Sequence, residues 1–213
     1  MQYLNPFLAT VAAYLLGSLS FAVIVSKCMG LNDPRTYGSK NPGATNVLRS
    51  GSKPAALVTL LLDGVKGWLP VALVSWFGKP YGLEDGSVAL VALAAFLGHL
   101  FPLFFRFEGG KGVATALGVM FGVDWVLGLA SALTWLIIAV FFRYSSLASL
   151  VAAVFAPVFY LFGNDVAWYV DTRILLALVL IALGLATRHR ENILRLVQGK
   201  ESRLGQGKKK PAG

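Results

Sequence analysis

The feature that most constrains the fold of this sequence is a series of long apolar stretches with very little charge. They cover residues 6–25, 54–77, 87–105, 113–142, 147–162 and 168–187. A helix needs about 20 mainly apolar residues to cross the hydrocarbon core of a bilayer. A soluble fold would leave too few polar residues for its surface, because 56% of the 213 residues are hydrophobic and only 14% are charged. The sequence therefore predicts an all-α integral membrane protein.

The number of spans depends on residues 113–142, which are too many for one upright helix and few for two. Gly122 and Asp124 interrupt this stretch, which favours a short span to about Val123 and another span from Trp125. Residues 6–25 are too long for a signal-peptide core and have no basic residue before them, so we interpret them as an uncleaved first span. Together these assignments predict seven transmembrane helices rather than six.

Charge also favours seven spans, because Lys and Arg accumulate on the cytoplasmic side of a membrane. With the N-terminus outside, seven spans place most of the 19 Lys and Arg residues in cytoplasmic segments. Six spans would put the basic first loop and the basic C-terminal segment on opposite sides. We therefore expect an outside N-terminus and a cytoplasmic C-terminus. We expect one transmembrane helical domain over residues 1–204 and a basic, disordered tail over residues 205–213.

The seven-span arrangement places four polar segments on the cytoplasmic side. The first, residues 37–46, reads Tyr-Gly-Ser-Lys-Asn-Pro-Gly-Ala-Thr-Asn and is followed by Arg49. Small residues let backbone amides approach an anion, and a helix starting after Pro42 would point its positive end at that anion. A connecting loop rich in Gly and Pro is the alternative. The length of the run and the nearby arginine favour a phosphate-binding loop.

The second segment surrounds Lys111 with glycines, in the run Glu-Gly-Gly-Lys-Gly-Val-Ala-Thr over residues 108–115. An ammonium and several amides at the mouth of a helix would meet a phosphate together. This is not a Walker A loop, because Gly112 follows the lysine where Ser or Thr is required, so nucleotide hydrolysis is not supported. The alternative for Lys111 is an anchor at the cytoplasmic interface. We expect His99, in the inner half of a span, to hydrogen-bond within the bundle.

The third segment is Arg-Tyr-Ser-Ser-Leu at 143–147, and the fourth covers residues 187–196. On a helix, His189 and Asn192 would share a face and reach one ligand. Glu191 and Arg195 are spaced to pair with each other, which is a structural role. Asp63 and Lys66, three apart within a span, are expected to neutralise each other and to support the site from behind.

Several classes of site are excluded by residue type. Two histidines and one cysteine, Cys28, leave almost no ligands for zinc and allow no intramolecular disulfide, and no aspartate cluster suggests magnesium. There is no G-x-S-x-G nucleophile elbow. We expect no metal, no cofactor and no nucleic-acid partner. What remains is a site that suits joining a small phosphorylated metabolite to a lipid.

The segments at 38–46, 98–99 with 109–115, 143–147 and 188–192 resemble, in order and spacing, the bacterial acyl-phosphate:glycerol-3-phosphate acyltransferase family. The resemblance implies a seven-helix enzyme of the bacterial inner membrane with its active site facing the cytoplasm. Such an enzyme moves an acyl chain from acyl phosphate to the 1-hydroxyl of sn-glycerol 3-phosphate. It releases lysophosphatidic acid and phosphate in the first step of phospholipid biosynthesis, so acyl phosphate, glycerol 3-phosphate and membrane lipid are its expected partners.

The resemblance also implies roles for individual residues. Acyl phosphate would be held by Asn41, Gly43, Ala44, Thr45 and Asn46. Glycerol 3-phosphate would be positioned by Ser39, Arg49, Lys111, Ser146, His189 and Asn192, with Gly109 and Gly110 beside the lysine. Among these, His189, Lys111 and Ser146 are the expected catalytic residues, with His189 the candidate general base and a substrate phosphate the alternative proton acceptor. Ser146 is preferred to Ser145 because it directly precedes Leu147.

Two other functions compete with this interpretation. A small transporter or flippase for anionic metabolites would also contain intramembrane charge and glycine-rich breaks, but it predicts an internal repeat that this sequence lacks. A structural protein that recruits anionic lipid would tolerate loss of Asn46 or Lys111.

Overall fold

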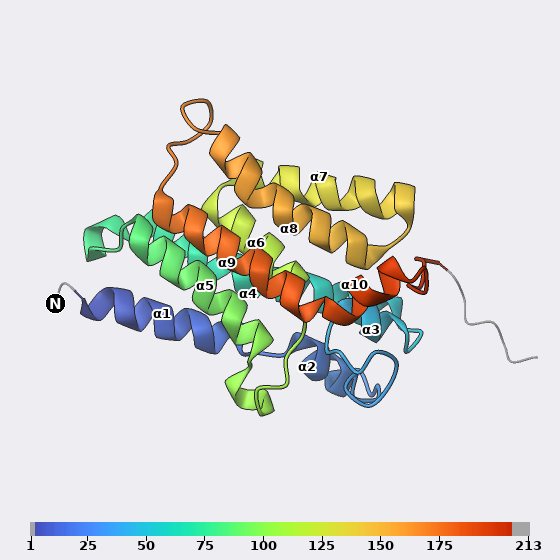
Figure 1. Ribbon diagram of the computed structural model, residues 1–213. Helices are drawn as coiled ribbons and strands as arrows, with labels where there is room; N and C mark the ends of the chain where they lie inside the picture. Colours follow the sequence, from blue (N-terminus) through green and yellow to red (C-terminus); the bar gives the residue numbers. More distant parts are fainter. Residues whose placement is uncertain (1–2, 206–213) are drawn as a thin grey trace, which may run out of the picture.

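The computed structural model describes residues 3–205, which form a bundle of helices with no β-strand in that range (Figure 1). The predicted all-α class is confirmed. Of the predicted basic tail, residues 206–213 lie outside the described residues. In chain order the helices are α1 (Leu4–Gly17), α2 (Phe21–Cys28), α3 (Ala44–Leu48), α4 (Lys53–Phe77), α5 (Asp85–Leu100), α6 (Val113–Val123), α7 (Trp125–Phe142), α8 (Ser145–Phe162), α9 (Thr172–Arg188) and α10 (Arg190–Val197), with short 3-10 turns η1 (Lys79–Tyr81) and η2 (Leu103–Phe105).

Four helical segments are long and apolar enough to cross a membrane: α4, α5 with the turn that follows it, α7 and α8. Two bent pairs, α1 with α2 and α9 with α10, raise the number of candidate spans to six if each pair is one span. The remaining predicted span falls on α6, a shorter apolar helix of 11 residues. The chain is therefore built as a multi-pass membrane protein with four to six candidate spans by length.

The predicted interruption between Gly122 and Trp125 is confirmed. Helix α6 ends at Val123 and α7 begins at Trp125. The Asp124 side chain between them accepts hydrogen bonds from the backbone N–H groups of Val126 at 2.7 Å and Leu127 at 3.3 Å. An aspartate at this position satisfies donors that a new helix leaves free, so it starts α7 in a new direction.

The predicted first span over residues 6–25 is a pair of helices that together can form one bent span. Helix α1 ends at Gly17, α2 starts at Phe21, and the two axes differ by 45°. The break frees the Leu19 carbonyl, which accepts a hydrogen bond at 2.7 Å from Nζ of Lys66 on α4. A backbone carbonyl within a membrane must find a partner inside the protein, and this buried ammonium supplies one.

Other predicted boundaries also shift. In the span expected over residues 87–105, the α-helix ends at Leu100 because Pro102 follows. The 3-10 turn η2 makes up the rest of this segment. The span expected from residue 168 begins at Thr172, where the Asp171 side chain caps the helix. Helix α8 starts at Ser145 rather than at residue 147.

Helices α4 and α6 pack closely because small residues line their contact. A Cβ on Gly118 of α6 would collide with the Gly64 backbone oxygen on α4, so these backbones approach as closely as glycine allows. Small residues at such contacts allow close van der Waals packing where lipid offers no hydrophobic driving force.

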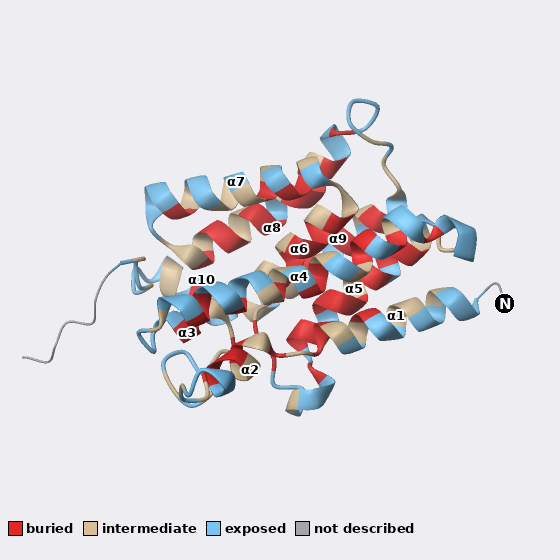
Figure 2. Cartoon of the chain, turned by 180° about the vertical axis from the view of Figure 1, so that it is seen from behind, coloured by how far each residue is buried: buried red, intermediate tan, exposed pale blue. Residues whose placement is uncertain are grey.

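The outside of the bundle is strongly apolar, as expected of a surface in contact with lipid. Figure 2 shows buried residues on the inward faces of the helices and exposed residues along their outward faces, α7 in particular. On α7 the exposed side chains include Leu129, Leu133, Leu136 and Val140.

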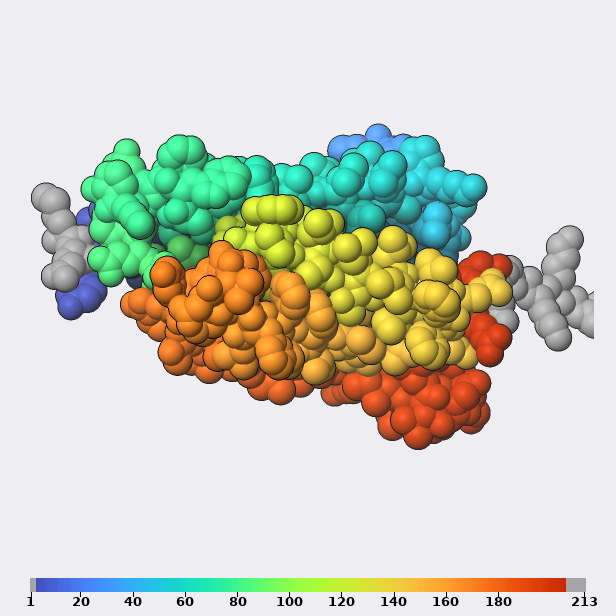
Figure 3. Space-filling view, turned by 90° about the horizontal axis from the view of Figure 1, so that it is seen from above, coloured from blue at the N-terminus to red at the C-terminus, as the bar shows by residue number. Residues whose placement is uncertain are grey.

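The polar segments of the chain gather at one end of the bundle. In Figure 1, α2, α3 and α10 lie at the end opposite to the start of α1. In Figure 3 the C-terminal segment, in red, lies beside the end of α7 at the same end of the molecule. Contacts of Gly110 with Pro42, of Lys111 with Asn192, and of both Asn192 and Ser146 with Glu201 join the four polar segments singled out from the sequence.

Candidate active site

The first polar loop is organised by the side-chain amide of Asn46, which is 2% exposed. Its Oδ1 accepts a hydrogen bond from the Ser39 N–H at 3.0 Å, and its Nδ2 donates to the carbonyls of Pro34 at 2.6 Å and Tyr37 at 3.2 Å. The sequence predicted contact between Asn46 and substrate. In the structure its amide holds the loop backbone in place.

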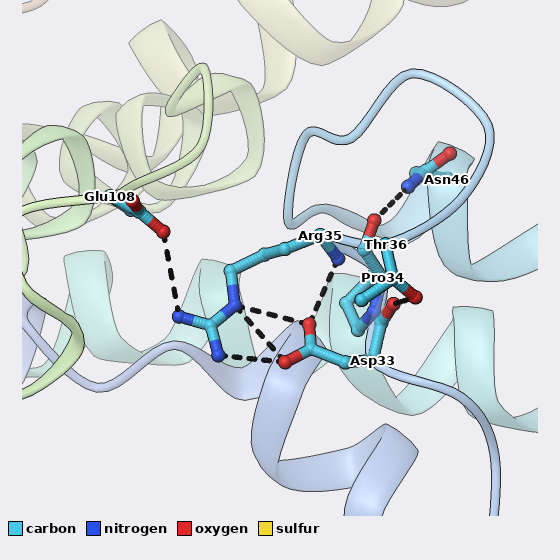
Figure 4. Close-up of polar contacts among 6 residues, drawn as sticks. All are labelled: Asp33, Pro34, Arg35, Thr36, Asn46 and Glu108. Atoms are coloured by element: carbon cyan, nitrogen blue, oxygen red, sulfur yellow. Dashed lines mark hydrogen bonds and ion pairs between the residues drawn. The ribbon is translucent and has the colours of Figure 1, made fainter.

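An ionic clasp, formed by Asp33, Arg35 and Glu108, joins this loop to the segment that precedes Lys111 (Figure 4). The Arg35 guanidinium donates three hydrogen bonds to the Asp33 carboxylate, the shortest at 2.7 Å, and lies 3.8 Å from the Glu108 carboxylate. A cavity of about 520 Å³ lies beside the clasp. None of the sequence-predicted site residues lines this cavity.

The other predicted residues of the first loop are accessible. Ser39, Thr45 and Arg49 are exposed, and Asn41, Gly43 and Ala44 are half-buried. The helix expected after Pro42 exists as α3, which begins at Ala44, although it has only five residues. The loop therefore presents polar side chains and a helix start outward from a fixed backbone.

Gly109 and Gly110 lie where no side chain would fit. A Cβ on Gly109 would collide with the His99 and Leu100 carbonyls. A Cβ on Gly110 would collide with Nε2 of His99 and would lie 2.7 Å from the Pro42 carbonyl, so Gly110 is where the first and second polar segments touch. Arg188 of α9 holds both glycine carbonyls, through Nε to Gly110 at 3.0 Å and through its terminal nitrogen to Gly109 at 2.5 Å.

Lys111 emerges from this packed turn and donates a hydrogen bond to Oδ1 of Asn192 on α10. The Asn192 Nδ2 donates to Oε1 of Glu201 at 2.7 Å, and the same oxygen accepts from Ser146 Oγ of α8 at 2.8 Å. Burial lowers the pKa of Lys111, and the negative charge of Glu201 opposes that shift. Three predicted residues from three segments are thus connected.

Glu201 is the member of this network that the sequence interpretation missed. Its side chain is 8% exposed, and its Oε2 accepts a 2.8 Å hydrogen bond from Nε of Arg195. The predicted pairing of Arg195 with Glu191 is present at 3.7 Å but is more exposed. Burial alone would raise the pKa of Glu201, but the hydrogen bonds from Arg195, Asn192 and Ser146 lower it. A single acidic residue in a segment dominated by basic residues gave no signal of its own.

His189 is buried at the junction of α9 and α10, with 3% of its surface exposed. Its Nδ1 lies 2.8 Å from the Leu185 carbonyl. Because a carbonyl only accepts, Nδ1 carries the proton and Nε2 of the neutral ring is left as an acceptor. Burial lowers the pKa of His189 to about 4. His189 and Asn192 are both buried at this end of the bundle.

A buried polar cluster lies behind the glycine turn. Asp63 and Lys66 form the predicted ion pair, with 2.7 Å between Oδ1 and Nζ. His99 lies 3.7 Å from the same Asp63 oxygen and 3.2 Å from the Thr115 hydroxyl. The expectation that His99 hydrogen-bonds within the bundle is confirmed. Among residues 3–205, no group of three or more His, Cys, Asp or Glu side chains is arranged to hold a metal ion.

Comparison with known proteins shows the family to which the chain belongs. The family profile described as glycerol-3-phosphate acyltransferase matches residues 7–199. The chain belongs to the glycerol-3-phosphate acyltransferase family. A family member from Albidiferax ferrireducens is 67% identical over 205 residues, which cover 96% of this chain and 92% of the relative. A second, from Cupriavidus pinatubonensis, is 61% identical over 95% of this chain and 98% of its own length.

A solved structure of the family has the same fold. The crystal structure of PlsY (YgiH), described as an integral membrane glycerol 3-phosphate acyltransferase, matches in its glycerol 3-phosphate form with a TM-score of 0.86 and 39% identity. That match covers 94% of this chain and 96% of the PlsY chain. The lysophosphatidic acid form matches with a TM-score of 0.84 and 38% identity. Family membership identifies this chain as an acyltransferase built into the membrane.

Proposed function

We propose that this protein transfers a fatty acyl group from acyl phosphate to the 1-hydroxyl of sn-glycerol 3-phosphate, giving lysophosphatidic acid and inorganic phosphate. The observation that carries the proposal is the connection of Lys111, Ser146 and Asn192 beside His189 at one end of a lipid-exposed bundle. Cations and neutral donors at such a boundary suit a phosphorylated polar substrate and an acyl chain in the bilayer. Acyl phosphate is already an activated mixed anhydride, so the protein needs to supply mainly orientation and charge stabilisation.

The first loop is proposed to bind acyl phosphate. Asn41, Gly43, Ala44 and Thr45 face the ligand in this proposal, whereas Asn46 keeps the loop in place. Glycerol 3-phosphate is assigned to Ser39, Arg49, Lys111, Ser146 and Asn192. Gly109 and Gly110 contribute by letting the Lys111 turn approach the first loop.

The proposed reaction is a direct attack without an acyl-enzyme. The 1-hydroxyl oxygen of glycerol 3-phosphate bonds to the acyl carbonyl carbon, and the bond from that carbon to the bridging phosphate oxygen breaks. The electron pair leaves with inorganic phosphate, whose charge Lys111 stabilises. The hydroxyl proton passes to Nε2 of His189, with a substrate phosphate oxygen as the alternative acceptor.

The low pKa of His189 is compatible with this role. The ring is neutral at physiological pH and keeps an unprotonated Nε2. A substrate phosphate bound nearby would favour the protonated ring and raise its pKa toward the range in which a general base works well.

We further propose seven spans, an outside N-terminus and a cytoplasmic C-terminus. Lys111 and Ser146 join one network, which supports a path in which α6 leaves this end of the bundle and α7 returns to it. The positions of the start of α1 and of α10 at opposite ends support an odd number of crossings (Figure 1). The basic loops then face the cytoplasm of a bacterium, with the enzyme in the inner membrane at the first step of phospholipid synthesis.

The test is phosphate release by purified protein in lipid with palmitoyl phosphate and glycerol 3-phosphate. Palmitoyl-CoA serves as a parallel donor, and Lys111→Ala is the inactive control. Release that needs both substrates, yields lysophosphatidic acid and is lost in the variant supports the proposal. Activity with the CoA donor alone would overturn the choice of donor, and silence of folded protein with both donors would favour a transporter.

A further inference from the structure

The carboxylate of Glu201 lies among the side chains assigned to glycerol 3-phosphate. It accepts hydrogen bonds from Ser146 at 2.8 Å, Asn192 at 2.7 Å and Arg195 at 2.8 Å. These donors come from the start of α8 and from α10, so one acidic side chain fixes two helix ends against each other. Hydrogen bonds to a charged group are stronger than those between neutral groups, and burial increases the cost of losing them.

Glu201 is presented by a C-terminal strap, residues 199–205, with anchors of its own. The Leu204 N–H donates to the Arg143 carbonyl at 2.6 Å, and the Arg143 guanidinium donates to the Leu204 carbonyl at 2.9 Å. Arg203 donates to the Tyr144 hydroxyl at 3.1 Å. The strap is therefore attached to the loop between α7 and α8, directly before Ser146.

The contact with Glu201 fixes the orientation of the Asn192 amide. Because Nδ2 donates to the carboxylate, Oδ1 must point the other way, and it accepts from Nζ of Lys111. With the amide reversed, NH₂ would face the ammonium and the carbonyl oxygen would face the carboxylate, so both contacts would be repulsive. Glu201 thus determines which atom of Asn192 meets Lys111.

We propose that Glu201 is a positioning residue of the glycerol 3-phosphate site, which holds Ser146, Asn192 and, through Asn192, the Lys111 ammonium in the arrangement that binds this substrate. The inference rests on the proposed function and deepens it. A carboxylate in this place has one other interpretation, that it occupies the position of the substrate phosphate and competes with it. The two interpretations predict opposite effects when the charge is removed.

The experiment compares steady-state kinetics of wild-type protein with Glu201→Gln, Glu201→Asp and Glu191→Gln. Each substrate is varied in turn while the other is saturating. Glu201→Gln replaces one acceptor oxygen with a donor, so we expect the KM for glycerol 3-phosphate to rise about tenfold or more. The KM for palmitoyl phosphate should change less than about twofold. Glu201→Asp keeps the charge and should recover part of the loss. Glu191 is the exposed partner of Arg195, so Glu191→Gln is the control and should behave as wild type.

Three results would overturn the inference. An unchanged KM for glycerol 3-phosphate in Glu201→Gln would remove the positioning role. Equal losses for both substrates together with a lowered melting temperature would leave only a structural role. A lower KM would identify Glu201 as a competitor of the substrate.

If wild-type protein makes no lysophosphatidic acid, the proposed function is wrong, but the inference about Glu201 can still be tested. In that case, calorimetric binding of glycerol 3-phosphate to wild type and to both Glu201 variants still tests the inference. Weaker binding to Glu201→Gln, partly restored in Glu201→Asp, supports it, and equal or tighter binding contradicts it.

Discussion

Nζ of Lys66 lies 2.7 Å from the Leu19 carbonyl, so a buried ammonium on α4 satisfies the backbone where α1 gives way to α2. The same nitrogen lies 2.7 Å from Oδ1 of Asp63. One side chain thus neutralises a buried carboxylate and completes a broken helix. Both contacts lie behind the glycine turn that carries Lys111, because Asp63 also faces His99.

Lys66→Met should strongly destabilise the protein. It leaves the Asp63 charge and the Leu19 carbonyl buried without this partner, and breaking a buried ion pair from one side costs about 3–5 kcal/mol. The double variant Asp63→Asn, Lys66→Met removes the uncompensated charge and should recover part of the loss. Melting temperatures in detergent measure both effects, and equal melting temperatures for the single and double variants would contradict this account.

Asn46→Asp should reduce both activity and stability. The substitution places an oxygen against the Pro34 and Tyr37 carbonyls in place of the donor NH₂, and an unmade buried hydrogen bond costs about 1–3 kcal/mol. Thr45→Ala, at an exposed position, should reduce activity with acyl phosphate while stability stays within about 0.5 kcal/mol of wild type. Thermal unfolding alongside kinetics separates the two roles. Unchanged stability of Asn46→Asp would show that Asn46 does not organise the loop.

Gly110→Ala should lower kcat/KM about 100-fold or more, because even a displacement of about 1 Å at a reacting site has an effect of this size. The new Cβ would collide with Nε2 of His99 and lie 2.7 Å from the Pro42 carbonyl, which separates the two polar segments. Gly64→Ala is the matched control, since its nearest neighbour is at 3.8 Å. Near-normal kinetics of Gly110→Ala would mean that the two segments need not touch.

Ser146→Ala should reduce activity, whereas Ser145→Ala should stay within about twofold of wild type. The Ser146 hydroxyl is buried and bonded to Glu201, but the neighbouring Ser145 contributes its backbone carbonyl, which accepts from Ser149. Parallel kinetic measurements on the two variants make the comparison. A larger loss in Ser145→Ala would reverse the assignment.

His189 makes a pH-dependent contribution to stability. Its pKa is about 4 in the folded protein, below the reference value of 6.5, so the unfolded chain binds more protons between these values. The stabilisation is fully present above pH 6.5 and is lost as pH falls from 6.5 toward 4. The melting temperature of His189→Gln should therefore fall less than that of wild type between pH 7 and pH 5. Parallel curves for the two proteins would contradict this linkage.

His189→Ala tests the role of the residue in catalysis. Removal of a general base typically costs about 10²–10⁴-fold in rate. A loss of only about tenfold, roughly 1.4 kcal/mol, would leave His189 with a binding role and transfer proton acceptance to a substrate phosphate. The rate should be measured at saturating concentrations of both substrates so that weaker binding does not imitate lost chemistry.

Much of this architecture could be predicted from local pattern alone. Apolar runs near the length of a span identified α4, α7 and α8, because the thickness of a bilayer sets the number of consecutive apolar residues that a spanning helix needs. The division at Asp124 was also visible, because an acidic residue after a glycine interrupts the run and caps the next helix. The ion pair of Asp63 and Lys66 followed from helical spacing.

The sequence by itself determined the all-helical membrane class, the four polar segments and the family to which they belong. The tertiary structure decided which of those residues touch. It broke the first span at Leu19, turned the Asn46 amide toward its own loop, and brought Glu201 between Ser146 and Asn192. Those contacts join residues far apart in the chain, and no periodicity or local spacing encodes them. Only the packing of the helices, which brings distant segments to one end of the bundle, determines which donor meets which acceptor.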